Sequence, residues 1–502
     1  MSEAIPGIGV PPVAPAAPAA VAILWRPGPK GTEICWLLRA KTLRFAGGFH
    51  ALPGGRVDAS DAQVPVQGAS GDAAMLRAAA ARELFEEVGI LAARGSGVLP
   101  DAAARRALLD GQASFAELLA SRGLELVAED WVEAGRWVTP EWAPRRFDTH
   151  FFLVRLPEGQ QIDPWVGELT EGGWSPVSEA LARWEAGKLL LHPPQLHVLR
   201  ALATHGPGDE GVAALRAGAQ TPDFIPATTE FQRGVRALAL RTATLAPATH
   251  THCYLVGEGE LLIVDPGSGD PAELSRLDAQ LEALEARGTR PVAVVLTHHH
   301  GDHVSGARAV AARRRLPIWC HPWTADHLGL TEARRLQEGE VLTLGASGPF
   351  PTRWQVFHTP GHAPGHLCLH EPALRTAVVG DMVAGLGTIL IDPDEGDMAA
   401  YLRELGRLRD LGVRTLHPAH GAPFPHAGEA LEALIAHRLQ REARVFDALS
   451  EQPQPSEAIS ASAYADSPTA HPMLAERSTC AHLIKLEREG RAVRDGEGWR
   501  RA

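Results

Sequence analysis

The stretch that decides the fold is Thr297-His298-His299-His300-Gly301-Asp302-His303, which places four histidines and an aspartate within seven residues. It directly follows the apolar run 292–296, a pattern typical of a buried strand. Neutral imidazoles suit zinc or iron, and a nearby carboxylate adds charge that can hold a second cation. The stretch therefore predicts a strand end that presents metal ligands. A polar surface loop that is merely rich in histidine is the alternative.

Three further candidate ligands lie downstream, each after a strand-like apolar run. His362 follows 354–357 through a Pro/Gly turn, Asp381 follows 376–379, and His420 follows 415–416. Because strand ends gather at one edge of a sheet, the order of these residues predicts one shared pocket.

The pattern His298-x-His300-x-Asp302-His303, with those later residues in order, resembles the metallo-β-lactamase fold superfamily. By that resemblance two metals are held as follows: one by His298, His300 and His362, the second by Asp302, His303 and His420, with Asp381 bridging both. The implied cofactor is a pair of zinc ions, with iron or manganese as alternatives. Zinc lowers the pKa of bound water to about 7, so hydrolysis at neutral pH is expected.

The same resemblance gives Asp302 a second role as a proton shuttle. Many true β-lactamases have a cysteine ligand where this chain has Asp381. In this respect the chain resembles the branch of the superfamily that cleaves thioesters or phosphodiesters. His366 is a candidate for orienting a ligand. We expect surface positions for the remaining histidines of this region, His299, His358, His417 and His426.

An acidic helix in the first part of the chain forms a second candidate site. Glu83, Glu86 and Glu87 lie three and four residues apart, so they crowd one helix face and repel each other unless a cation lies between them. Hard oxygen ligands of this kind suit Mg²⁺ or Mn²⁺. A solvated acidic face is the alternative.

Gly55 followed by Arg82-Glu83-x-x-Glu86-Glu87-x-Gly89-Ile90 resembles the Nudix box of diphosphate hydrolases. The resemblance implies metal binding by Glu86 and Glu87, metal binding or water activation by Glu83, and an ion pair from Arg82 that braces the loop. The sequence departs from the box at Asp61, where glutamate is usual, and in the long insertion 62–81. That insertion is similar to the branch that includes peroxisomal coenzyme A diphosphatases, and Arg39, Arg44 and Gly55 would contact the substrate.

The last part of the chain predicts two helices, 427–449 and 475–489, and a β-wing at 491–501. This pattern resembles the winged helix that follows the hydrolase domain in the β-lactamase-like protein two family, whose members cleave single-stranded RNA. The basic residues that would contact phosphates are Lys485, Arg488, Arg491, Arg494, Arg500 and Arg501. A small cap that packs on the hydrolase is the alternative.

Composition bounds the rest. With 502 residues, 45% hydrophobic and 22% charged residues, the chain is too long for one core, and its net charge of −12 argues against gross attraction to membranes or nucleic acid. The five scattered cysteines indicate a reducing compartment, which predicts a cytoplasmic protein. No apolar run reaches the length of a membrane span.

The expected architecture is multidomain α+β and α/β. It comprises a Pro/Ala-rich tail (1–20), a Nudix α/β/α sandwich (21–205), a linker (206–225), a metallo-β-lactamase αβ/βα sandwich (226–426), and a helix with a small C-terminal winged-helix domain (427–502). The leading functional hypothesis is a bifunctional hydrolase. Its Nudix site would cleave a small-molecule diphosphate, coenzyme A derivatives among the candidates, and its zinc site a thioester or phosphodiester. The alternatives are an RNA-processing endoribonuclease with a nucleic-acid-binding winged helix, and a chain in which one module is a retired scaffold.

Overall fold

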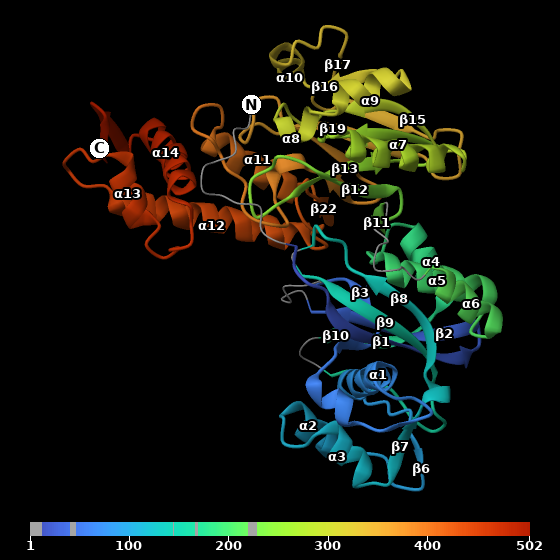
Figure 1. Ribbon diagram of the computed structural model, residues 1–502. Helices are drawn as coiled ribbons and strands as arrows, with labels where there is room; N and C mark the ends of the chain where they lie inside the picture. Colours follow the sequence, from blue (N-terminus) through green and yellow to red (C-terminus); the bar gives the residue numbers. More distant parts are fainter. Residues whose placement is uncertain (1–12, 41–46, 144, 166–168, 219–227) are drawn as a thin grey trace. The chain divides into compact units, whose positions relative to one another are not determined.

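The computed structural model describes residues 13–40, 47–143, 145–165, 169–218 and 228–502. The chain forms two compact units, Pro12–Arg233 and Gly234–Ala502 (Figure 1). Within the described ranges, no helix is both long enough and apolar enough to cross a lipid bilayer.

The first unit is built on a mixed sheet in the order β10-β2-β1-β9-β8, with β3 paired to β2 and β4 to β1. Its strands are β1 (Ala17–Gly28), β2 (Gly31–Arg39), β3 (His50–Ala51), β4 (Gly54–Arg56), β8 (Val132–Val138), β9 (Phe147–Arg155) and β10 (Leu169–Pro176). Strand β1 runs parallel to β9 and antiparallel to β2. Strand β11 (Thr229–Gln232) ends the unit.

Helices cover both faces of this sheet because its strands alternate in the direction of their apolar side chains. Ala22 and Leu24 of β1 pack in a core with the helix α1 (Asp72–Val88). Ile23 between them packs in a second core with α4 (Val177–Glu185) and α5 (Pro193–His205). These three layers are the α/β/α sandwich expected from the sequence.

Two predicted boundaries of this unit are wrong. Strand β1 begins at Ala17, inside the expected Pro/Ala-rich tail. Residues 17–20, three alanines and a proline, pair with strand β9 and so belong to the sheet. The expected linker contains the helix α6 (Asp209–Ala217), whose Leu215 is buried in the same core as α5. The Gly and Ala content of this segment masks its helical spacing.

The insertion before α1 and the region after it add short elements. These are η1 (Ala59–Gln63), β5 (Val66–Gln67), β6 (Arg94–Gly95), α2 (Ala102–Leu109), α3 (Phe115–Ala120), β7 (Leu124–Val127) and η2 (Ala128–Asp130), with β5, β7 and β6 forming a small sheet.

The second unit contains two sheets packed face to face. One includes β12 (Val235–Arg241), β13 (His250–Val256), β14 (Glu260–Val264), β15 (Arg290–Val295), β16 (Ile318–Cys320) and β17 (Arg334–Arg335) in that order. The other has the order β18 (Val341–Leu344), β19 (Thr352–His358), β20 (Leu367–Glu371), β21 (Thr376–Val378) and β22 (Thr415–His417).

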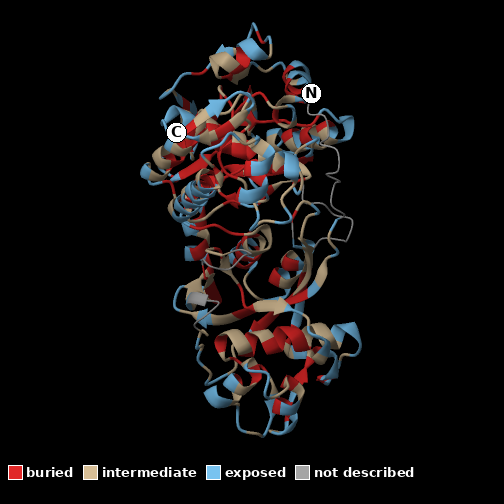
Figure 2. Cartoon of the chain, turned by 90° about the vertical axis from the view of Figure 1, so that its left-hand side faces the viewer, coloured by how far each residue is buried: buried red, intermediate tan, exposed pale blue. Residues whose placement is uncertain are grey.

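Apolar side chains from both sheets meet between them, for example Val264 and Val295 with Trp354 and Leu369. The outer face of the first sheet is covered by α7 (Pro271–Glu285), α9 (Ala307–Arg314) and α10 (Pro322–His327). The outer face of the second is covered by α11 (Met398–Asp410) and the start of α12 (Ala427–Ala448). The buried layers between helix and sheet are visible as the red segments of Figure 2.

The C-terminal part is a small helical domain with a β-hairpin wing. The helix α12 continues into α13 (Ser456–Ala463), α14 (Pro472–Arg488), β23 (Ala492–Asp495) and β24 (Gly498–Arg501). Val445, Ile459, Leu483 and Trp499 share its core. The two helices and the wing predicted from the sequence are present, and the short helix α13 is an addition.

Candidate metal centre and Nudix helix

Seven side chains converge where the strands of the second unit end. His298 and His300 follow β15, His303 lies in the short helix α8 (Gly301–Val304), and His362 follows β19. Asp381 lies in η3 (Gly380–Met382) after β21. Asp302 of α8 and His420 after β22 complete the set, so the fold brings together all seven residues singled out in the sequence.

Three histidines form one cluster, called here the three-histidine position: His298, His300 and His362. Nε2 of His298 lies 3.0 Å from Nδ1 of His300, and Nε2 of His362 lies 3.0 Å from the same atom. Donor atoms of a tetrahedral zinc site are roughly 3.3 Å apart. This spacing fits a single ion between the three rings.

The second cluster, the mixed position, comprises Asp302, His303 and His420. Nε2 of His420 lies 3.5 Å from Oδ2 of Asp302, and Nε2 of His303 lies 3.8 Å from it. Asp381 stands between the clusters. Its Oδ1 is 3.4 Å from His420 Nε2 and its Oδ2 is 3.5 Å from His362 Nε2, so one oxygen faces each position.

The outward nitrogen of each candidate ligand histidine has an oxygen partner, which fixes the tautomer. His362 Nδ1 donates to the carbonyl of Leu390 at 2.9 Å, and His420 Nδ1 donates to that of His250 at 3.0 Å. His300 Nε2 donates to Glu395 Oε1 at 2.5 Å. Because these partners only accept, the inward nitrogen keeps its lone pair for a metal.

Asp265 fixes the tautomers of the other two candidate ligand histidines, His303 directly and His298 through Thr297. Its Oδ2 accepts from His303 Nδ1 at 2.9 Å and from Thr297 Oγ1 at 2.6 Å, and its Oδ1 accepts from Thr297 N at 2.7 Å. Since the Thr297 hydroxyl donates to Asp265, it accepts from His298 Nδ1 at 3.0 Å. One buried carboxylate thus orients a ligand in each cluster.

The electrostatics suit cation binding. Burial lowers the pKa of His298 well below its usual value and that of His362 to about 4, so both rings are neutral. Burial raises the pKa of Asp381, but His420 and His303 outweigh it and hold that pKa well below normal, so Asp381 is ionised.

Two inward atoms support a fit to metal directly. His303 Nε2 and Asp381 Oδ1 are buried and make no hydrogen bond. Buried polar atoms without hydrogen-bond partners are rare in native proteins. Neutral imidazoles and carboxylates form the donor set that zinc takes, and the residues present therefore fit a two-ion centre.

Two glycines give the ligands room. Gly361, directly before His362, has φ 137°, and a Cβ there would lie 2.4 Å from Tyr401 Cα. Gly380, directly before Asp381, has φ 45°, and its Cβ would lie 2.7 Å from His366 Nε2. Both positions therefore need glycine.

The remaining histidines differ partly from expectation. His366 Nε2 accepts from the Asp381 amide at 3.1 Å, the orienting contact expected of it. His299 and His417 are buried, so their predicted surface placement is wrong. Nε2 of His299 lies 2.9 Å from Glu395 Oε2, an acid that the sequence reasoning missed together with Asp265.

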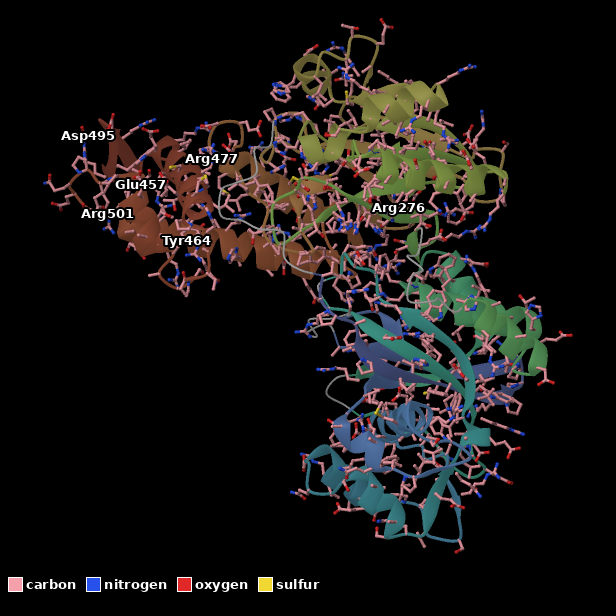
Figure 3. All side chains as sticks on the ribbon, in the orientation of Figure 1. Arg276, Glu457, Tyr464, Arg477, Asp495 and Arg501 are labelled. Atoms are coloured by element: carbon pink, nitrogen blue, oxygen red, sulfur yellow. The ribbon has the colours of Figure 1, made fainter. Side chains whose placement is uncertain are left out.

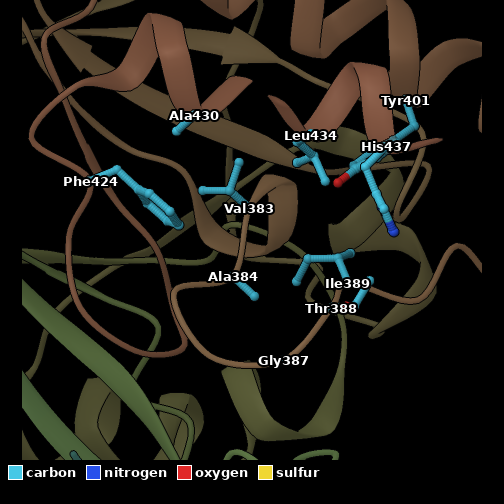
Figure 4. A pocket seen from close by; sticks show the side chains of 10 residues that line it. All are labelled: Val383, Ala384, Gly387, Thr388, Ile389, Tyr401, Phe424, Ala430, Leu434 and His437. Carbon is cyan, nitrogen blue, oxygen red and sulfur yellow. The ribbon is translucent and has the colours of Figure 1, made fainter. Parts of the chain in front are cut away.

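An apolar cavity of about 150 Å³ lies in the same unit (Figure 4). Its lining includes Val383 and Ala384, which follow Asp381, and Thr388 and Ile389, which precede Leu390. Leu434 of α12 closes one side. The segments that carry the metal-centre contacts therefore also build an apolar wall.

In the first unit, Arg82 gathers the acidic groups of the Nudix helix. It contacts both oxygens of the fully buried Asp61 at 2.8 and 3.0 Å, and its Nη1 lies 2.9 Å from Glu83 and 3.0 Å from Glu86. Its Nη2 also donates to the Arg56 carbonyl. The insertion 62–81 therefore does not separate the two halves of the box in space.

The other predicted residues of this site take separate places. Glu87 accepts from the amide of Gly54, and a Cβ at Gly55 would lie 2.5 Å from Glu83 Oε1. Arg39 ends β2, and Arg44 lies outside the described residues. Among described residues, the groups that gather three ligand atoms are all in the second unit. In this structure Glu83 and Glu86 turn onto Arg82 instead.

Burial raises the pKa of Glu83 to about 7, although Arg82 opposes the shift. A carboxyl group that titrates near neutral pH has the property required of a general base.

The second unit is thus an αββα sandwich with histidine and aspartate clusters at its strand ends. Residues 246–420 match the family described as the metallo-beta-lactamase superfamily, residues 64–202 match the NUDT19 Nudix domain, and residues 456–499 match the beta-lactamase associated winged helix domain. The chain is therefore a metallo-hydrolase that combines a Nudix domain, a metallo-β-lactamase domain and a winged helix.

Individual relatives cover parts of the chain. The Beta-lactamase-like protein 2 homolog of Caenorhabditis elegans is 28% identical over 247 residues, 48% of this chain and 79% of the relative. The Atrochrysone carboxyl ACP thioesterase of Passalora fulva is 30% identical over 206 residues, 40% of this chain and 57% of the relative, so the chain spans little more than half of it. The crystal structure of a NUDIX hydrolase from Alicyclobacillus acidocaldarius is 32% identical with a TM-score of 0.37, covering 41% of this chain and 98% of that one.

Proposed function

We propose that the chain is a bifunctional hydrolase whose metallo-β-lactamase domain cleaves a thioester and whose Nudix domain cleaves a diphosphate. The observation that carries the first half is the convergence of His298, His300, His362, Asp302, His303 and His420 around Asp381. Relatives named as thioesterases support the choice of thioester. The apolar cavity beside these segments would suit the hydrocarbon part of such a substrate.

In this proposal the seven side chains hold two zinc ions, with iron or manganese as alternatives. When bound, such ions acidify water and polarise the substrate carbonyl. Asp302, whose Oδ2 faces the mixed position, would accept the proton of the attacking water on its other carboxylate oxygen and return it to the leaving sulfur. Thr251 Oγ1 lies 3.4 Å from Oδ2 and would keep the carboxylate oriented.

For the Nudix domain, Glu83, Glu86 and Glu87 would offer oxygen ligands to Mg²⁺ or Mn²⁺. Glu83 would take a proton from water, which its raised pKa favours. Arg82 would hold the helix against η1 through Asp61. A coenzyme A derivative as substrate would let one chain act on both a thioester and a diphosphate, with Arg39, Arg44 and Gly55 as the substrate contacts.

The alternative is RNA cleavage at the zinc site with the winged helix binding nucleic acid. Its support is the winged-helix match and the β-lactamase-like relative. The ion pairs of the basic residues weaken it. Lys485 lies 2.9 Å from Glu442, Arg488 2.6 Å from Asp397, and Arg500 3.3 Å from Asp495.

The test is a substrate panel on the full chain: an acyl-coenzyme A, free coenzyme A and single-stranded RNA, with Zn²⁺ and Mg²⁺ varied separately. We expect thioester cleavage to need Zn²⁺ and to vanish in His298→Ala, and diphosphate cleavage to need Mg²⁺ and to vanish in Glu86→Gln. Loss of the same single activity in both variants would refute the two-site proposal. Zinc-dependent RNA cleavage without thioester cleavage would favour the alternative.

A further inference from the structure

The segment between Leu390 and Asp397 supports the three-histidine position from outside. The Leu390 carbonyl accepts from His362 Nδ1, and Glu395 accepts from His300 Nε2. At its end, the Asp397 amide donates to the carbonyl of Gly361 at 2.8 Å. This segment, called here the support loop, thus contacts two of the three candidate ligands and the residue before one of them.

The support loop is held in turn by the C-terminal domain. Arg477 of α14 grips Asp392 with both nitrogens of its fork, through Nε to Oδ2 at 2.8 Å and through Nη2 to Oδ1. Its Nη2 also reaches Asp394 at 2.6 Å. Arg488, the last residue of α14, lies 2.6 Å from Asp397. Figure 3 labels Arg477 on the helix.

The Arg477–Asp392 pair has the geometry that makes an ion pair rigid. A bidentate pair fixes direction as well as distance, unlike single contacts between exposed groups. The loop adds its own turn here, because Asp392 also accepts from the Asp394 amide at 2.9 Å and from the Gly396 amide at 2.7 Å. Glu395 therefore lies inside a turn whose first residue is clamped.

We propose that Arg477 is a positioning residue for the metal centre: through Asp392 and the support loop, the winged helix sets the orientation of His300 and His362. The winged helix then influences the geometry of the three-histidine position, whether or not the winged helix itself binds a partner. This inference rests on the proposed metal-binding role of that position.

The test is titration of the metal-free full chain with Co²⁺, followed by the visible absorption of the bound ion, which reports its coordination. We expect Arg477→Met to weaken Co²⁺ binding at the tighter-binding position by about tenfold, the lower end of effects seen for groups that orient ligands, and to alter the band. Arg500→Met is the matched control, because its side chain is 35% exposed against 34% for Arg477 and its partner Asp495 lies in the wing. It should bind Co²⁺ within twofold of the wild type.

Two partner variants complete the design. Asp392→Asn should reproduce the effect of Arg477→Met, and the double variant should add nothing further, because both changes open the same contact. If Arg477→Met does not fold, Asp392→Asn carries the test alone. Wild-type affinity and an unchanged band in Arg477→Met, or an equal loss in Arg500→Met, would overturn the inference. Absence of Co²⁺ binding in the wild type would overturn the proposed metal centre as well.

Discussion

Asp265 should control metal affinity although it offers no ligand atom. It accepts three hydrogen bonds, from His303 Nδ1, Thr297 Oγ1 and Thr297 N. In Asp265→Asn one oxygen becomes an NH₂ group, which faces either the Thr297 amide or the other two donors. At least one buried donor then loses its acceptor in either orientation, at a cost of about 1–3 kcal/mol.

This loss destabilises the metal-bound state, in which His303 must be held in place. Zinc affinity should therefore drop roughly 5- to 150-fold, since about 1.4 kcal/mol corresponds to a tenfold change in a dissociation constant. The assay is competition for Zn²⁺ with a chromogenic chelator. Asp270→Asn is the matched control, because Asp270 caps α7 by accepting from the Ala272 amide at 2.8 Å and asparagine caps equally well. Zinc affinity in Asp265→Asn within twofold of the wild type would refute the reasoning.

Three further predictions concern stability. Arg82→Met should lower the free energy of unfolding by about 3–5 kcal/mol, because it removes the ion-pair partner of the buried Asp61. The control Arg106→Met, at an exposed ion pair, should change that free energy little. Hydrogen exchange of α1 measures the stability of both variants, and equal protection in the two would contradict the prediction. Burial lowers the pKa of His192 to about 4 from 6.5, so the unfolded state gains its proton first and stability should fall by up to about 3 kcal/mol as pH drops from 6.5 to 4. His192→Phe should reduce this dependence of stability on pH. Urea unfolding of the first unit, followed by proteolysis at several pH values, measures it, and an unchanged pH dependence would contradict the prediction. Removal of zinc by dialysis against a chelator should lower the calorimetric Tm, because an ion at a hundredfold excess over its Kd stabilises the folded state by about 2.7 kcal/mol. An unchanged Tm would mean that the seven donors bind no ion.

Residues that bear the chemistry could be predicted from the sequence because their types and spacing are local. His298, His300, Asp302 and His303 lie within one loop, and each later candidate follows its own apolar strand. The layers of both units were expected from the resemblance to the two families, whereas the alternation and helical spacing of apolar residues predicted single strands and helices.

The supporting contacts could not be predicted this way. Asp265 lies 32 residues before Thr297, and Glu395 lies 95 residues after His300, so only the fold brings them together. Asp265 ends a strand-like run, as the ligands do, and that was the one available signal. Helix α6 was missed because its glycine and alanines resemble a linker, and its place is set by the burial of Leu215.

The left-handed glycines Gly361 and Gly380 have a practical consequence for anyone who wishes to change what this hydrolase accepts. Libraries should leave these two codons untouched, because a side chain there would shift His362 or Asp381 before any new substrate could be selected. Val383, Ala384 and Thr388 are better positions to vary, because they line the apolar wall and are not among the seven candidate ligands.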